Sequence, residues 1–341
     1  MGQRYLVSGA SGFIAAHVVE QGLAAGHQVT GTVRNPEDAA RVGHLRGLAG
    51  ADRLTLVAAD LMAPDPFSAH MDVDAVLHLA SPYAITVADP QRDLVDPAVQ
   101  GTLAMLRAAA ASRRVKRVVL TSSMAAVTDS PGDKVLTEAD WNDQSSLTRN
   151  PYYYSKTLAE RAAWDFMARE KPGFDLVAIN PFLVVGPCHT ATINTSVQTL
   201  VNLIRGTYPA VMALTWGFVD VRDVAAAHLA AVARPAAEGR YLCVSENLSM
   251  AACIALIRAE GYSGKLPKID LSGPFGTALM KLAALTQDRG TASYLRTHLG
   301  RVPQYDAAKS RRDLGIAYRS AADALRDTLA DLARWGHISK I

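Results

Sequence analysis

Near the start of the chain stands Gly9-Ala10-Ser11-Gly12-Phe13-Ile14-Ala15, directly after the apolar run Tyr5-Leu6-Val7. Apolar residues then recur at helical spacing, which predicts a strand, a tight glycine turn and a helix. Such a turn suits a pyrophosphate, because glycine permits a sharp bend and the helix start offers unpaired N–H groups. Alanine at the third fingerprint position is within the allowed pattern. We therefore expect a dinucleotide site rather than an ordinary strand–helix turn. Its expected cofactor contacts are Gly9, Ser11, Gly12, Phe13 and Ile14.

The composition is that of an ordinary globular protein, with 341 residues, 49% of them hydrophobic, and a net charge of +3. The length suits one large domain or a domain with an attached lobe. The sequence contains no basic run, RNA-binding signature or Cys/His cluster, so we expect neither a nucleic acid partner nor a metal. The cysteines, Cys188, Cys243 and Cys253, are scattered, which argues against a disulfide framework and favours a reducing cytoplasm.

Membrane association is not expected either. No apolar run reaches the length of a membrane span, and the first predicted strand begins too early for a signal peptide. We expect a cytoplasmic protein that works as a monomer or a homodimer.

Apolar runs alternate with helical patterns over the first 180 residues. The predicted strands are Arg4–Ser8, Gln28–Val33, Leu54–Ala58, Ala75–Leu79, Arg117–Thr121 and Leu176–Asn180. The predicted helices between them include Pro90–Ser112 and Tyr152–Arg169. This alternation implies parallel strands joined by right-handed crossovers, hence an α/β protein with a Rossmann-type doubly wound sheet. Ligands of such sheets bind beyond the carboxyl ends of the strands.

The alternation weakens after Pro181. Helical patterns then stand between connections that contain Pro and Gly, at Ser196–Arg205, Val221–Ala233, Ala251–Ala259 and Ala278–Thr286. We expect a smaller, mostly helical C-terminal lobe that covers the substrate. The expected division is a cofactor domain at 1–180 rejoined by about 214–247 and part of the C-terminus, a lobe at 181–213 and 248–305, and a packing segment at 306–341. That last segment includes a predicted helix at Ala321–Arg334.

One predicted helix begins with Tyr152-Tyr153-Tyr154-Ser155-Lys156. Tyr152 and Lys156 are four residues apart and therefore share a helical face. The pKa of a free tyrosine is about 10, and a nearby ammonium lowers it because it favours the phenolate. Tyr152 is thus a candidate proton donor, whereas Tyr153 and Tyr154 are expected to pack or to line the substrate pocket. The spacing alone is common by chance.

Thr121-Ser122-Ser123 directly follows an apolar strand and so falls at its carboxyl end. A hydroxyl at that place can hydrogen-bond the carbonyl oxygen of a substrate. The alternative is a strand-end turn in which the hydroxyls cap the next segment.

The glycine turn, the strand-end serine and the Tyr-x-x-x-Lys helix occur together in one chain. With them, the sequence resembles the extended short-chain dehydrogenase/reductase superfamily. The closest likeness is to its dihydroflavonol reductase, cinnamoyl-CoA reductase and aldehyde/ketone reductase group. Matching segments run through nearly the whole chain, at Val7 to Ala15, Thr32 to Pro36, His78 to Pro82, Thr121 to Ser123, Tyr152 to Glu160, Asn180 to Pro187, Phe218 to Ala225 and Ala308 to Gly315.

The resemblance implies a role for each matching residue. Ser123 would orient the carbonyl, Tyr152 would donate the proton, and Lys156 would hydrogen-bond the nicotinamide ribose and tune Tyr152. Tyr152 and Lys156 would also contact the cofactor. The other implied cofactor contacts are Asp60, Leu61, Ala80, Ser81, Pro82, Thr121, Pro181, Leu183 and Val184.

The cofactor is expected to be NADP(H). An NAD enzyme usually has Asp or Glu near the end of the second strand, to bind the ribose 2′-OH. Here that place holds Arg34, whose guanidinium suits a 2′-phosphate, and Arg41 matches a second basic residue of the plant reductases. Glu37 and Asp38 stand nearby, and the alternative for Arg34 is a solvated loop charge.

The function that follows is NADPH-dependent reduction of an aldehyde or ketone, with the alcohol oxidised in the reverse direction. Two alternatives remain: an NAD-dependent nucleotide-sugar epimerase or dehydratase, and a non-catalytic dinucleotide-sensing or scaffold protein.

His78 is expected to be packed rather than catalytic, and His189 and Cys188 are possible neighbours of the substrate lobe. A further set of apolar residues fits either the core or a substrate pocket: Met212, Leu214, Trp216 and Phe218.

Overall fold

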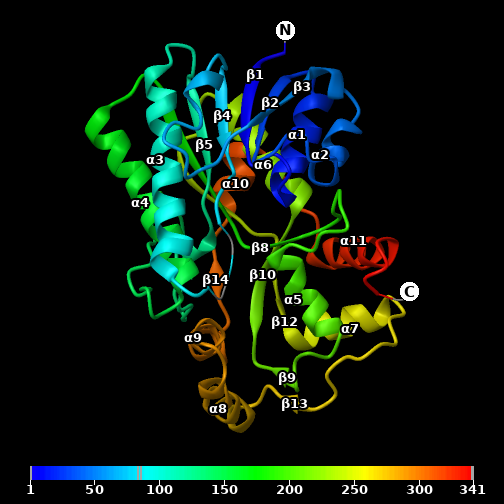
Figure 1. Ribbon diagram of the computed structural model, residues 1–341. Helices are drawn as coiled ribbons and strands as arrows, with labels where there is room; N and C mark the ends of the chain where they lie inside the picture. Colours follow the sequence, from blue (N-terminus) through cyan, green and yellow to red (C-terminus); the bar gives the residue numbers. More distant parts are fainter. Residues whose placement is uncertain (1, 83, 85–86, 339–341) are drawn as a thin grey trace.

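A seven-stranded parallel sheet forms the centre of the computed structural model, which describes residues 2–82, 84 and 87–338 (Figure 1). The strand order is β11-β7-β5-β4-β1-β2-β3. In chain order the strands are β1 (Arg4–Ser8), β2 (Gln28–Val33), β3 (Leu54–Ala58), β4 (Ala75–His78), β5 (Arg117–Thr121), β7 (Asp175–Pro181) and β11 (Gly239–Cys243). The chain runs outward from β1 in one direction and then from β4 in the other. This confirms the doubly wound sheet, whose ligand crevice lies between β1 and β4.

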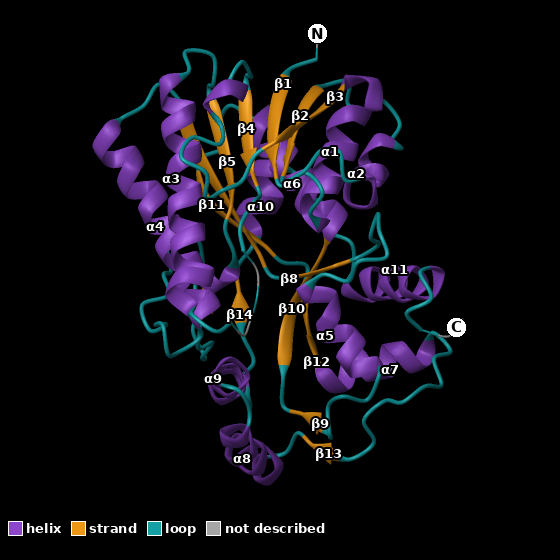
Figure 2. Cartoon of the chain, in the orientation of Figure 1, coloured by secondary structure: helices purple, strands orange, loops and turns teal. Residues whose placement is uncertain are grey.

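Helices cover both faces of this sheet (Figure 2). The helices beside it are α1 (Phe13–Ala24), α2 (Ala39–Arg46), α3 (Asp96–Ala111), α4 (Pro151–Glu170), α6 (Val221–Ala233) and α10 (Ala308–Leu314). Helix α3 packs against α4, and α1 packs against α6. Side chains alternate along β1, since Leu6 joins the cluster under α3 and α4 while Tyr5 and Val7 join the cluster under α1. Both faces of β1 are therefore buried, which explains its continuous apolar run.

A second lobe follows β7. Its helices are α5 (Thr195–Ile204), α7 (Met250–Ala259), α8 (Pro274–Ala283), α9 (Arg289–His298) and α11 (Ala321–Arg334). Three short strands form one small sheet in the order β12-β10-β8, with β8 (Leu183–Val185), β10 (Thr215–Asp220) and β12 (Glu246–Ser249). Two strand pairs complete it, β9 (Val211–Met212) with β13 (Asp270–Leu271), and β6 (Val135–Leu136) with β14 (Gln304–Tyr305).

The segment 214–247 divides between the two sheets. Strand β11 extends the seven-stranded sheet beside β7, whereas β10 pairs with β8 and β12 in the second lobe. A set of apolar side chains on and before β10 belongs to the core of that lobe: Met212, Leu214, Trp216 and Phe218. Met212 and Leu214 also border a small cavity of about 280 Å³. Over the part of the chain that the structure describes, no helix is both long and apolar enough to cross a membrane.

Four single turns complete the main chain path. They are 3₁₀ turns at η1 (Ala51–Arg53), η2 (Ser68–His70), η4 (Met124–Ala126) and η5 (Ala284–Thr286). In addition, one π turn, η3 (Gln91–Val95), leads directly into α3, so the helix predicted from residue 90 begins irregularly.

Candidate active site

The glycine turn between β1 and α1 lies at the crevice. Gly9 has a φ of +65°, and a Cβ there would come within 3.1 Å of the Ala80 Cα. The turn closes with a hydrogen bond from the Gly12 N–H to the Gly9 carbonyl, 2.8 Å long. Gly12 is also the N-cap of α1 and supplies no side-chain cap, so the first N–H groups of the helix remain available to an anion. Ser11 and Gly12 are exposed, as a pyrophosphate site requires.

Gly9→Ala is expected to lower the free energy of unfolding by about 1–2 kcal/mol, because a left-handed backbone is strained for any residue with a Cβ. The added methyl group also presses on Ala80, so NADPH binding should weaken too. Chemical denaturation and cofactor titration measure both effects. Gly43→Ala is the control, since Gly43 lies in α2, where an added methyl group would have no described neighbour within 4 Å, and should be neutral or stabilising.

The loop after β4 is fixed to the end of β1 by one serine. The Ser8 Oγ accepts hydrogen bonds from the N–H groups of Leu79 and Ala80, each 2.9 Å long, and lies 2.8 Å from the His78 Nδ1. Burial and, as a smaller effect, the Lys156 ammonium together lower the pKa of His78 to about 3, so this ring is neutral. His78 is thus packed and hydrogen-bonded. The arrangement holds Ala80-Ser81-Pro82, all half-buried, beside the glycine turn.

Ser123 and Lys156 approach the same edge of the sheet from different elements. Ser123 follows β5 in an extended conformation, and its Oγ accepts a hydrogen bond of 3.2 Å from the Ala125 N–H. Lys156 lies in the second turn of α4 and is buried, with its Nζ donating to the Thr121 carbonyl at 3.5 Å. Helix α4 packs on the turn that Ser123 begins, and the Thr157 Oγ1 lies 3.4 Å from the Ala125 carbonyl.

Burial lowers the pKa of Lys156 to about 8, and the carboxylate of Glu160, one turn further on, opposes this. This pKa still lies above 7, so the protonated form of the side chain predominates at neutral pH. Tyr152, half-buried, lies one turn before Lys156 on the same helix. The Tyr153 ring meets it edge-on at 6.0 Å, and the Tyr153 hydroxyl lies 3.3 Å from the His298 Nε2. Tyr153 is thus held by the second lobe.

The other predicted contacts occupy the ends of neighbouring strands. Asp60 and Leu61 follow β3, and Leu61 packs against Gly101 of α3. Pro181 ends β7, while Leu183 and Val184 belong to β8. The Thr121 hydroxyl lies 2.6 Å from the His228 Nε2, so its carbonyl rather than its side chain is directed at Lys156.

Both arginines predicted to bind a 2′-phosphate are exposed. Arg34 directly follows β2. Arg41 lies in the first turn of α2, with its Nε 3.3 Å from the Asp38 carboxylate. Glu37 is exposed in the intervening turn.

A buried ionic network behind the site was not predicted. The Glu160 carboxylate accepts hydrogen bonds from the Ser122 hydroxyl, the Asn180 amide at 2.8 Å and the Arg240 guanidinium at 2.6 Å. The Asn180 amide also donates to the Ser123 carbonyl at 3.1 Å. The network thus connects α4 with β7, β11 and the residues that follow β5, next to the candidates Ser123 and Lys156. Ser122, Glu160 and Asn180 fall in segments that match the reductase family, whereas nothing in the sequence pointed to Arg240.

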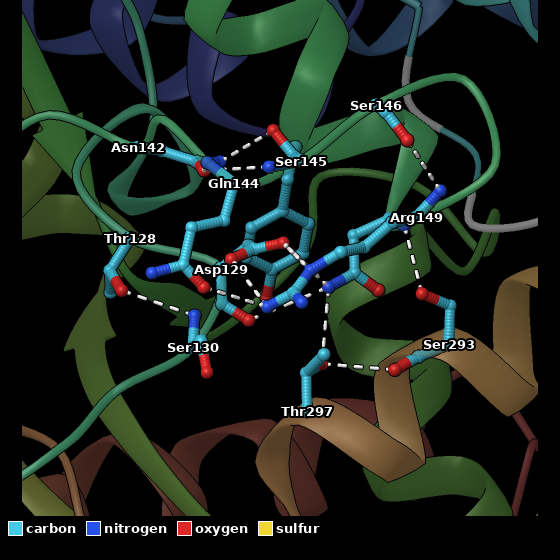
Figure 3. A network of polar contacts seen from close by, with 12 residues as sticks. Thr128, Asp129, Ser130, Asn142, Gln144, Ser145, Ser146, Arg149, Ser293 and Thr297 are labelled. Atoms are coloured by element: carbon cyan, nitrogen blue, oxygen red, sulfur yellow. Dashed lines mark hydrogen bonds and ion pairs between the residues drawn. The ribbon is translucent and has the colours of Figure 1, made fainter.

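A second network links the start of α4 to helix α9 of the second lobe (Figure 3). The Arg149 guanidinium donates to the buried Asp129 carboxylate, 2.8 Å from its Nε. Asn150, the N-cap of α4, has a φ of +48°. Its backbone N–H donates to the Ser293 Oγ at 3.0 Å, and its side-chain amide donates to the Thr297 Oγ1 at 3.1 Å. The lobe thus contacts the start of α4 two residues before Tyr152.

Beside this network is a cavity of about 830 Å³, between the loop that precedes α4 and helix α9. The described residues that line it include four arginines and no carboxylate: Arg149, Arg289, Arg296 and Arg301.

Comparisons with known proteins identify the family of this chain. Residues 5–243 match the model of the NAD dependent epimerase/dehydratase family. The chain is 36% identical to cinnamoyl-CoA reductase 1 of Arabidopsis thaliana, over 99% of this chain and 91% of that protein. It is 33% identical to tetraketide alpha-pyrone reductase 1 of the same plant, over 98% of this chain and 97% of the relative.

The solved structure of yeast methylglyoxal/isovaleraldehyde reductase, complexed with NADPH, superposes with a TM-score of 0.80 at 29% identity. The superposition covers 98% of this chain and all of the yeast chain. The chain therefore belongs to the NAD-dependent epimerase/dehydratase family of extended short-chain dehydrogenases/reductases, within which it resembles the cinnamoyl-CoA and aldehyde reductase group.

Proposed function

We propose that this protein is an NADPH-dependent carbonyl reductase in which Tyr152 donates the proton to the oxygen of an aldehyde or ketone. The observation that carries the proposal is the buried Lys156 ammonium, one turn from Tyr152 and directed at the carboxyl end of β5, where Ser123 lies. Burying an ammonium group costs free energy because the group loses its hydration. A lysine this deeply buried is therefore a candidate for a functional role. The relatives named above are reductases, which supports the same reaction class.

The structure fits a dinucleotide cofactor. A Cβ at Gly9 would crowd Ala80, and the start of α1 presents uncapped N–H groups. When bound, the reduced nicotinamide supplies the hydride. The loop that Ser8 fixes and the residues from Pro181 to Val184 would form the walls that orient this ring.

The chain's own groups would handle the carbonyl oxygen. Ser123 would donate a hydrogen bond to that oxygen as negative charge develops on it, and Tyr152 would deliver the proton. Lys156 would make the phenol more acidic because its positive charge favours the phenolate. Lys156 retains its proton at pH 7, so this effect persists at neutral pH.

For the cofactor we propose NADP(H), with Arg34 as the group that binds the 2′-phosphate. Arg34 is exposed at the end of β2, and no carboxylate occupies its place in the sequence. The yeast structural neighbour is complexed with NADPH, which supports this choice. A cytoplasmic location and a monomeric or homodimeric state stay predictions.

Arg34→Ala is expected to raise the KM for NADPH by about 10–150-fold, because a charge-assisted hydrogen bond contributes roughly 1.5–3 kcal/mol. The KM for NADH should change less than about threefold, since NADH has no 2′-phosphate. Steady-state kinetics with both cofactors tests this. The Arg34→Ala/Arg41→Ala double variant shows how much Arg41 contributes to binding of the 2′-phosphate.

Arg113→Ala serves as the matched control, because Arg113 is exposed near the amino end of β5, away from the crevice. Equal weakening of both cofactors in Arg34→Ala would make Arg34 a solvated loop charge. Purified protein that retains NAD would instead favour the epimerase alternative.

A further inference from the structure

We propose that His17, Glu20 and His189 form a binding site for one divalent transition-metal ion, of which Zn²⁺ is the best match. His17 and Glu20 lie on α1, and His189 lies in the segment that follows β8. None of the three belongs to the residues proposed above to bind the cofactor or the carbonyl. The sequence alone predicted no metal, because His189 stands far from the other two along the chain and no ligand spacing connects them.

The tautomer of His17 is the first argument. Its Nε2 lies 2.9 Å from the Pro187 carbonyl, which can only accept, so Nε2 carries the ring hydrogen. In the neutral ring, Nδ1 then presents a lone pair. This Nδ1 is buried and lacks a hydrogen-bond partner among the described residues, although the His17 side chain is only 4% exposed. A histidine that donates one ring N–H to a carbonyl and offers the other nitrogen has the usual arrangement of a metal ligand.

The distances are the second argument. The Glu20 Oε2 lies 3.3 Å from the His17 Nδ1 and 3.3 Å from the His189 Nε2, and all three ligand atoms lie within 4.8 Å of one another. A ring N–H donating to a carboxylate usually approaches to about 2.9 Å. Two ligands bound to Zn²⁺ at 2.0–2.1 Å in a tetrahedron lie about 3.3 Å apart. The spacing therefore fits a shared cation better than hydrogen bonds.

The two imidazole rings of the cluster pack closely against each other. The rings of His17 and His189 are 4.3 Å apart, so two protonated rings would repel each other. The His189 Nε2 also lacks a hydrogen-bond partner among the residues described. A third ring, His44, stacks 6.3 Å from His189, and its Nε2 is likewise buried without such a partner in the described chain.

One cation lies near the cluster. The Arg334 side chain is 61% exposed and ion-paired with Asp331 at 2.8 Å. Solvent and this carboxylate therefore screen its charge.

Two imidazoles and one carboxylate are the donor set that Zn²⁺ and its neighbours in the transition series prefer, with a fourth position left for water. Because α1 packs on the seven-stranded sheet and His189 follows β8, a bound ion would link these two parts of the chain. We assign this ion a structural role at the junction of the two lobes.

The test uses the full chain with every affinity tag removed, because a polyhistidine tag would bind the same ions. Zn²⁺ is titrated in competition with a chromogenic chelator, and thermal unfolding is recorded with and without Zn²⁺. We expect one ion per chain and a higher Tm in its presence. His189→Ala and Glu20→Gln should each weaken Zn²⁺ binding by at least about 10–100-fold, the range seen when even outer groups of metal sites are removed.

His70→Ala is the control for unspecific binding by histidine, since His70 is half-buried in η2 and outside the cluster. His17 is left intact, because its Nε2 also holds Pro187. Co²⁺ gives an independent readout through the visible absorption of a tetrahedral site. Failure to bind Zn²⁺ at one equivalent, or equal affinity in wild type and His189→Ala, would overturn the site and leave an ordinary histidine–carboxylate pair. Neither result bears on carbonyl reduction.

Discussion

Tyr152→Phe lowers kcat for carbonyl reduction by about 10²–10⁴-fold, the usual contribution of a general acid–base group. The substitution removes the phenolic hydroxyl and keeps the ring. Because Tyr152 is half-buried on α4 and its ring contact with Tyr153 survives, the fold should persist. NADPH binding should also persist, since the glycine turn and Arg34 lie elsewhere. Stopped-flow and steady-state assays with a panel of aldehydes and ketones measure the loss.

Tyr153→Phe is the matched control, with the same chemical change one residue away. It removes the hydrogen bond to His298, which costs about 0.5–1.5 kcal/mol of stability, but leaves the face shared with Lys156 intact. Turnover should fall far less than in Tyr152→Phe. Near-normal turnover of Tyr152→Phe, or equal losses in both variants, would remove Tyr152 as the proton donor.

Glu160→Gln is expected to lower the free energy of unfolding by about 3–5 kcal/mol, the usual effect of removing one partner from a buried ion pair. Glu160 and Arg240 are both buried, and the guanidinium lies 2.6 Å from the carboxylate. Glutamine keeps the shape but leaves Arg240 charged without a counter-ion. Denaturant unfolding measures the change. Glu260→Gln is the control, because the pair between Glu260 and Arg326 is partly exposed to solvent and should contribute at most about 1 kcal/mol.

The same substitution also alters the pH profile. The Glu160 carboxylate raises the pKa of Lys156 against the effect of burial, so its loss lowers that pKa below about 8. Lys156 would then lose its proton at a lower pH, and the alkaline limb of kcat should move in the acid direction. A stability loss similar to that of Glu260→Gln, with no displacement of this limb, would contradict the ionic role of Glu160.

Local patterns predicted the sheet well. The strand bounds at β1, β2, β3 and β5 match the expected residues, because each strand has a cluster of apolar residues that ends where polar turn residues begin. Strand β10 was harder to place. Its apolar residues suit any buried sheet, and only the tertiary contact with β8 and β12 assigns it to the second lobe.

Helix α9 was missed for a physical reason. Leu295 is its one large apolar side chain in the buried part, and polar residues such as Thr297 and His298 occupy the rest of that face. A helix held mainly by hydrogen bonds to another element lacks the apolar stripe on which a sequence prediction depends. Arg240 and His189 were missed for a related reason. Their partners, Glu160 and Glu20, lie far away in the chain, so no local pattern connects the residues of either pair.

The bonds from Asn150 to Ser293 and Thr297 limit how this enzyme can be re-engineered. Exchanging the second lobe for that of a relative would also replace the two hydroxyls that bind Asn150 at the start of α4. A chimera that keeps Tyr152 and Lys156 but lacks hydroxyls at positions 293 and 297 would leave the Asn150 amide groups without these acceptors. The graft should therefore carry α9 and the loop before α4 as one unit, so that a new pocket does not displace the tyrosine that serves it.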